Sequence, residues 1–130
     1  MAFRCPNCSR PDTLRIGSRL ELPSDSRSDE ITLQVVECSA CSFAAMAVYQ
    51  ESRRGSLDFD SFEHIGYYVS AEVLSSLRRD VRSCPRPSST DCECAAHHRW
   101  GRQDETGRWN ALDDVPRGEH FWMEWHRKVG

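Results

Sequence analysis

The residues of this sequence best suited to chemistry are cysteines, and four of them form two closely spaced pairs. Each pair has the spacing Cys-x2-Cys, and the four residues of this first centre are Cys5, Cys8, Cys38 and Cys41. The spacing lets a tight turn direct both sulfurs of a pair at one point, and four thiolates are a tetrahedral ligand set. The sequence therefore predicts a metal ion at these four cysteines.

The three remaining cysteines form a second group with a nearby histidine. The spacing is Cys-x7-Cys-x-Cys-x2-His, and the residues of this second centre are Cys84, Cys92, Cys94 and His97. Three thiolates and one imidazole also complete a tetrahedron, so we expect a second metal ion here, with His98 as an alternative fourth ligand. A set of free surface thiols is the other interpretation, because the spacing follows no established zinc-binding pattern.

The cysteine count and the ligand types favour zinc over disulfides. The two predicted centres use all seven cysteines, and an odd number would leave one cysteine unpaired in a complete disulfide framework. The N-terminus has no apolar stretch typical of a signal peptide, and no segment approaches membrane-spanning length. We therefore expect two zinc ions per chain, a cytoplasmic location where thiols stay reduced, and no membrane partner.

The first centre and its flanking residues resemble the zinc ribbons of transcription, translation and RNA-processing proteins. The resemblance covers residues 3–50 and rests on the four cysteines and on Phe43 after the second pair. It implies a fold and a metal but no activity, since zinc ribbons serve many functions. The spacing is also similar to that of rubredoxin, an iron protein with glycine after each cysteine pair. This chain has Ser9 and Ser42 there, and residues 9–37 contain no Phe, Tyr or Trp, so zinc is favoured.

Hydrophobic periodicity predicts the strands that position the first centre. Apolar residues alternate over residues 12–22, with an interruption near Gly17, and again over residues 31–35, and a third apolar stretch covers residues 43–50. Together these segments predict a small three-stranded antiparallel zinc ribbon. Its apolar set is small, so we expect residues 1–50 to depend on the metal for folding.

Beyond the ribbon, the sequence predicts one helix and short strands. Residues 57–64 are acidic and indicate irregular structure, whereas Ser70 has the position of an N-cap and precedes apolar residues at helical spacing over residues 71–82. We expect a hairpin turn at residues 104–107 and a strand over residues 121–125, with a helix as the alternative because Phe121, Trp125 and Val129 also have helical spacing. The expected fold class is therefore α+β: the ribbon, one central helix, and a C-terminal zinc-stapled segment with short strands.

Length and composition limit the organisation and the activity. A chain of 130 residues with a hydrophobic fraction of 38% allows a zinc ribbon over residues 1–50, with the helix, second centre and Trp-rich tail of residues 51–130 packed against it as one unit. Both centres have four predicted ligands and no open position for a water, so we expect no enzyme activity. A catalytic second centre, with Glu93 as acid or base beside three cysteines, is the alternative.

The C-terminal aromatic residues are the best candidates for binding a partner. All four tryptophans lie in residues 100–130, and the predicted contacts are Trp109, Trp122, Trp125 and Arg108. The alternative is that the tryptophans complete a small core. The leading hypothesis is a non-catalytic two-zinc adaptor that recognises a protein or a protein–nucleic-acid assembly, without a small-molecule substrate.

Two other function classes fit the same sequence. The first is rubredoxin-like electron transfer at the four-cysteine centre. The second is direct nucleic-acid binding, which a net charge of −3 does not favour but a local set of arginines would allow. That set consists of Arg4, Arg10, Arg15 and Arg19, with Arg53 and Arg54.

Overall fold

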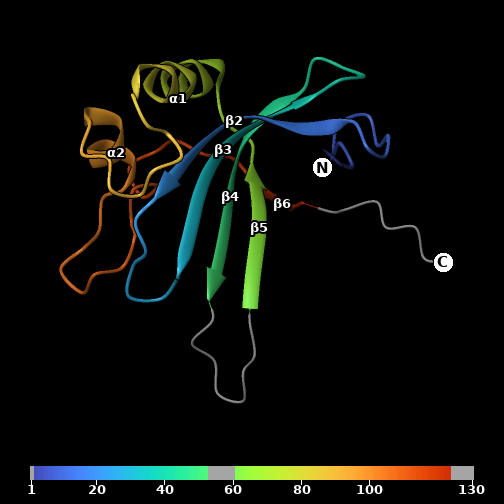
Figure 1. Ribbon diagram of the computed structural model, residues 1–130. Helices are drawn as coiled ribbons and strands as arrows, with labels where there is room; N and C mark the ends of the chain where they lie inside the picture. Colours follow the sequence, from blue (N-terminus) through green and yellow to red (C-terminus); the bar gives the residue numbers. More distant parts are fainter. Residues whose placement is uncertain (1, 53–60, 124–130) are drawn as a thin grey trace.

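The computed structural model describes residues 2–52 and 61–123, and its main element is a six-stranded antiparallel sheet that curls into a half-barrel (Figure 1). The strands lie in the sheet in chain order, so each one pairs with its neighbours in the sequence. They are β1 (Ala2–Phe3), β2 (Leu14–Leu22), β3 (Glu30–Cys38), β4 (Ala44–Ser52), β5 (Ser61–Tyr67) and β6 (His120–Trp122).

Two helices, α1 (Ala71–Ser83) and α2 (Ala95–Trp100), pack against one face of the sheet (Figure 1). The predicted start of α1 is confirmed, because the Ser70 side chain accepts a hydrogen bond of 3.2 Å from the backbone N–H of Val73. The sequence did not predict α2, since six residues are too few to show helical periodicity. None of the described helices is both long and apolar enough to cross a membrane.

The core has two parts on opposite faces of the sheet. The larger cluster lies between the sheet and the helices, and it includes Leu20, Leu22, Ile31, Leu33, Val35, Met46, Val48, Leu74, Leu77, Trp100 and Leu112. The smaller cluster lies on the other face, and it consists of Phe3, Cys5, Leu14, Val36, Ala45, Ala47 and Met123. All side chains from Ile31 to Val36 are buried, because β3 lies inside the sheet and contributes side chains to both faces.

A β-bulge in β2 transfers its apolar side chains from one cluster to the other. The pairing with β3 shifts by one residue between Ile16 and Ser18, so Gly17 is an extra residue on β2. Because side chains alternate between faces, one extra residue reverses the faces that follow it. Leu14 before the bulge therefore packs in the smaller cluster, whereas Leu20 after it packs in the larger one. The predicted interruption near Gly17 is this bulge.

The predicted three-stranded ribbon with one central helix is wrong. The three predicted strands exist as β2, β3 and β4, but β1 extends the sheet at one edge and β5 and β6 extend it at the other. The sheet therefore includes strands from beyond residue 50, where the predicted ribbon ends. A second helix, α2, also forms, so the predicted single helix is not the only one.

The strand β5 was missed because its sequence lacks the expected apolar alternation. Residues 61–64, predicted to be irregular, belong to it, and residues 57–60 lie outside the described residues. One face of β5 carries His64 and Gly66 in place of apolar side chains. The His64 ring is buried and its Nε2 lies 2.7 Å from Oε1 of Gln34, so tertiary contacts satisfy a polar side chain inside the sheet.

The C-terminal predictions agree with the structure where residues are described. Gln103 and Trp109 form an antiparallel bridge, and Asp104 Oδ1 accepts hydrogen bonds from Thr106 and Arg108, which confirms the predicted hairpin turn. The predicted strand over residues 121–125 is present at residues 121 and 122 of β6. Residues 124 and 125 lie outside the part of the chain that the structure describes.

Candidate metal centres

The four cysteines of the first centre meet at one end of the sheet. Cys5 and Cys8 follow β1, whereas Cys38 ends β3 and Cys41 lies in the turn before β4. Their sulfurs all lie within 4.8 Å of one another, with 3.8 Å between Cys5 and Cys41 and 3.7 Å between Cys8 and Cys38. A tetrahedron of sulfurs around zinc has edges of about 3.8 Å. These side chains could therefore hold a metal ion.

The turn at the first cysteine pair forms without a glycine. The backbone N–H of Ser9 donates to the carbonyl oxygen of Cys5 at 2.9 Å, and the N–H of Cys5 donates to the carbonyl oxygen of Arg10 at 3.2 Å. Ser9 has a φ of 64°, in the left-handed region where a residue with a Cβ is strained by about 1–2 kcal/mol. The sharp turn expected of a metal-binding pair is thus present, although serine replaces glycine.

The thiols of the first centre differ in their acidity. Burial raises the pKa of Cys5 to about 12. Burial also acts to raise the pKa of Cys38, but hydrogen bonds from the Thr13 hydroxyl and from the backbone N–H groups of Ala40 and Cys41 outweigh it and lower the pKa to about 6. A metal cation suits this set, since it stabilises the thiolate form that burial alone disfavours.

The second centre joins the end of α1, the loop after it and α2. Cys84 follows α1, Cys92 lies in the loop, and Cys94 is the N-cap of α2, in which His97 lies three residues further on. The Cys84 and Cys92 sulfurs are 3.7 Å apart, and His97 Nδ1 lies 3.3 Å from the sulfurs of Cys84 and Cys94. All four ligand atoms lie within 4.8 Å of one another, so this group could also hold a metal ion.

The structure brings His97 into the second centre and leaves His98 exposed. His97 Nε2 lies 2.9 Å from the carbonyl oxygen of Glu21 on β2. An N–H at Nε2 that donates to this oxygen leaves the lone pair of Nδ1 directed at the cysteine sulfurs, as metal-binding histidines require. The N–H of Glu21 in turn donates to the carbonyl oxygen of Pro87 at 2.8 Å, so β2 holds both the histidine and the cysteine loop.

Burial and backbone hydrogen bonds also shift the pKa values of two thiols of the second centre in opposite directions. Burial raises the pKa of Cys84 to about 11, whereas a hydrogen bond from the backbone N–H of Cys94 lowers the pKa of Cys92. Both cysteines and His97 are buried beside the larger cluster. Buried, low-polarity surroundings and a soft thiolate–imidazole donor set suit a metal ion held by four protein ligands.

Trp109, one of the predicted partner-binding tryptophans, packs against the larger cluster. Trp109 is half-buried; its backbone N–H donates to Asp25 Oδ2 at 2.6 Å and its indole N–H donates to the carbonyl oxygen of Trp100 at 2.7 Å. Trp100 is fully buried, and its indole N–H donates to Asp80 Oδ2 at 2.8 Å. Trp100 therefore belongs to the larger cluster, and Trp109 packs against it.

Of the other predicted partner residues, the structure describes Trp122 and Arg108. Trp122 on β6 is 58% exposed, and its partner in the sheet is Ile65 of β5. Arg108 is exposed and lines, with Trp109, a cleft that Trp122 does not line. Trp125 lies outside the described residues.

The bulge in β2 also places two of the arginines predicted to bind nucleic acid on opposite faces of the sheet. Arg15 pairs with Glu37, whose carboxylate forms an ion pair with Arg78 of α1 on the helix side of the sheet. Arg19, after the bulge, pairs with Gln34 on the opposite side. Arg4 and Arg10 are exposed near the first centre, and two further arginines lie outside the described residues, Arg53 and Arg54. The described arginines thus do not share one face.

Comparison with known proteins returned no relative. No family model, no curated protein and no solved structure matches the chain.

Proposed function

We propose that this protein is a non-catalytic zinc protein, in which two zinc ions hold the fold together and an exposed surface recognises a protein partner. The observation that carries the proposal is the complete set of four converging ligand atoms at each centre. Catalytic zinc sites leave one position to water or substrate, whereas structural sites are filled by four protein ligands. Sets with three or four thiolates are typical of the structural class.

Elemental analysis of the purified protein tests the metal proposal. We expect two zinc ions per chain, one zinc in Cys92→Ser and one in Cys8→Ser. The adjacent histidines provide a matched pair of variants: His97→Ala should release the second zinc, and His98→Ala should keep it. One zinc in the unaltered chain would refute the second centre, and red protein containing iron would support an electron carrier instead.

The proposed partner surface is centred on Trp122. This side chain lies on the edge strand β6, on the helix side of the sheet because its partner Ile65 pairs with Val48 of the larger cluster. The exposed ring can bury a large area on binding with little loss of rotamer entropy. Among the described strands β6 pairs only with β5, so its other side offers backbone groups to a partner segment.

Substitution of exposed aromatic residues tests this surface. Trp122→Ala should abolish capture of the native partner while zinc content and fold stay unchanged. Phe62→Ala is the matched control: Phe62 is 66% exposed but lies on the opposite face, three residues along β5 from Ile65. Equal loss of binding in both variants would place the interface elsewhere.

Direct nucleic-acid binding is a second and weaker proposal. It rests on the exposed arginines near the first centre, and the opposite faces of Arg15 and Arg19 count against a continuous basic strip. Binding to oligonucleotides that weakens steeply with salt, and that Arg4→Gln with Arg10→Gln reduces, would favour it.

A further inference from the structure

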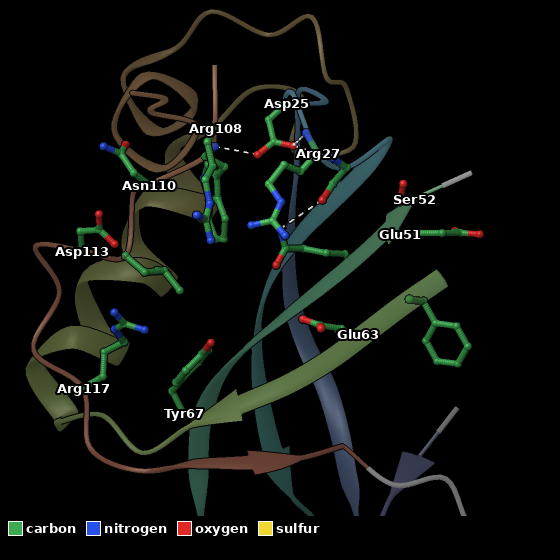
Figure 2. Close-up of a pocket in the computed structure, with 15 residues that line it drawn as sticks. Asp25, Arg27, Glu51, Ser52, Glu63, Tyr67, Arg108, Asn110, Asp113 and Arg117 are labelled. Carbon is green, nitrogen blue, oxygen red and sulfur yellow. Dashed lines mark hydrogen bonds between the residues drawn. The ribbon is translucent and has the colours of Figure 1, made fainter. Parts of the chain in front are cut away.

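A cleft of about 510 Å³ opens on the helix side of the sheet, away from both metal centres (Figure 2). Its walls come from three parts of the chain that are distant in sequence. They are the loop between β2 and β3, the C-terminal end of β4 with residues of β5, and the segment of residues 108–117 after the hairpin. This volume is within the range of sites that bind small ligands.

Three guanidinium groups point into this cleft. All three arginines line the cleft, and Figure 2 shows Arg27 and Arg108 in its upper part and Arg117 lower down, near Tyr67. Within residues 2–52 and 61–123, no ion pair or hydrogen bond engages any of these three guanidinium groups. Three guanidinium groups in one cleft, without an ion pair or hydrogen bond to the described residues, suit an anion, above all a phosphate, which accepts hydrogen bonds in pairs from arginine.

The acidic residues of the cleft do not cancel this charge. Asp25 accepts hydrogen bonds from the backbone N–H groups of Arg27, Ser28 and Trp109, so its carboxylate serves to hold the walls together. Glu51 points away from the centre in Figure 2 and accepts a hydrogen bond of 3.1 Å from the Tyr49 hydroxyl.

Two further acidic groups line the cleft, and the Asp104 carboxylate acts on Arg108 from outside it. The Glu63 side chain points into the cleft, and Asp113 belongs to the wall that also carries Arg117 (Figure 2). These carboxylates accept hydrogen bonds from hydroxyl or amino groups, and they repel a second and third phosphate. The balance of charge therefore favours a ligand with one phosphate and several hydrogen-bond donors.

Aromatic rings form part of the same walls. The Arg117 guanidinium carbon lies 5.1 Å from the centre of the Tyr67 ring, so the arginine rests on the face of a tyrosine that also lines the cleft. The Trp109 ring is fixed in place by its indole hydrogen bond to Trp100. Fixed aromatic and guanidinium planes stack on flat ring systems such as nucleobases.

We propose that this cleft binds a small phosphate monoester that carries a flat ring and hydroxyl groups, of which a nucleoside 5′-monophosphate is the model. Arg27, Arg108 and Arg117 hold the phosphate, and Glu63 accepts hydrogen bonds from the sugar or base. This inference does not depend on the proposed partner surface at Trp122. The sequence carries no sign of it, because its residues come from separate segments that only the fold brings together.

Calorimetric titration of the zinc-loaded protein with adenosine 5′-monophosphate tests the proposal. We expect saturable binding at one site, with adenosine and inorganic phosphate each at least tenfold weaker, since each makes only part of the contacts. Arg108→Gln and Arg117→Gln should each weaken binding about tenfold or more. Arg79→Gln, an exposed arginine of α1 outside the cleft, is the matched control and should leave affinity unchanged.

Defined results would overturn the proposal. Absence of binding by the monophosphate, or equal binding in Arg117→Gln and the original protein, would exclude this site for such ligands. Tighter binding of a phosphoserine peptide than of the nucleotide would show that the cleft takes a phosphorylated protein instead. Zinc content and the circular dichroism spectrum, measured on each variant, separate loss of the ligand site from loss of the fold.

Discussion

The two metal centres have similar ligands but hold different parts of the fold. The first centre connects two turns at one end of the sheet, beside the smaller cluster. The second connects α1, the following loop and α2, and through His97 it also holds β2. Cys84, Cys92 and His97 are buried, whereas Cys8 and Cys41 of the first centre are partly exposed. The first centre closes an edge, and the second holds the helices over the larger cluster.

This difference predicts that the two metal ions contribute unequally to the stability of the fold. The sequence indicated that the first centre alone must support a small ribbon core. In the structure, Leu33 and Val35 of β3 pack beneath α1 and α2 in the larger cluster. Loss of the second metal would free the loop and helix that cover this cluster, whereas loss of the first would free a strand of two residues and two turns.

The largest predicted effect compares one cysteine from each centre. Cys92→Ser should lower the free energy of unfolding by about 5 kcal/mol or more, because structural zinc contributes on this scale and the buried ligands lose their cation. Cys8→Ser should cost clearly less and should raise amide exchange only around β1 and the adjacent turns. Urea unfolding in reducing, zinc-containing buffer measures both. Equal losses would remove the proposed difference between the centres.

The next prediction concerns pH and the region of the smaller cluster. Burial lowers the pKa of His64 to about 4, and the ring packs edge-on against Phe3 and Tyr49. The His64 ring takes up a proton near pH 6.5 in the unfolded chain, but only near pH 4 in the folded chain. The stability that the neutral ring contributes is therefore complete above pH 6.5 and is lost as the pH falls toward 4, by up to about 3 kcal/mol.

Comparison of variants isolates this histidine from the metal ligands. His64→Gln should flatten the dependence of stability on pH between 7 and 5 relative to the original chain. His98→Gln, which removes an exposed imidazole, should leave that dependence unchanged. An unchanged slope in His64→Gln would show that this ring does not control acid sensitivity.

A smaller effect tests how α2 is attached on the helix side. Asp80 of α1 accepts hydrogen bonds from the buried Trp100 indole at 2.8 Å and from Arg99 at 2.9 Å. Asp80→Ala leaves the buried indole N–H without a partner and should cost about 1–3 kcal/mol. Asp114→Ala removes an exposed ion pair with Arg102 and should cost less than about 1 kcal/mol. Thermal unfolding compares the two, and similar costs would contradict a structural role for the indole bond.

The smallest predicted effect is a gain in stability at the first centre, whereas the preceding substitutions lower stability. Ser9→Gly relieves a left-handed backbone conformation and should raise the free energy of unfolding by up to about 1 kcal/mol. Ser42→Gly, at the equivalent place after the second pair, should not stabilise, because Ser42 is not among the described residues with positive φ. Denaturant midpoints at equal zinc occupancy decide between them. A gain from Ser42→Gly alone would refute the assigned strain.

The sequence alone determined the features that depend on local spacing. The cysteine spacings identified both ligand groups, since two Cys-x2-Cys pairs have little other use in a chain with seven cysteines. Alternating apolar residues located β2, β3 and β4, and the N-cap at Ser70 located the start of α1. The interruption at Gly17 was visible, although its effect on the two faces of β2 was not.

Only the tertiary structure decided the features that depend on contacts between distant segments. His97 is selected over its neighbour because the carbonyl oxygen of Glu21 fixes its ring. The strand β5 forms although His64 and Gly66 break its apolar pattern, because pairing with β4 and the bond to Gln34 satisfy its polar groups. Local sequence cannot encode such partners, since the energy of a buried polar group depends on what the fold places beside it.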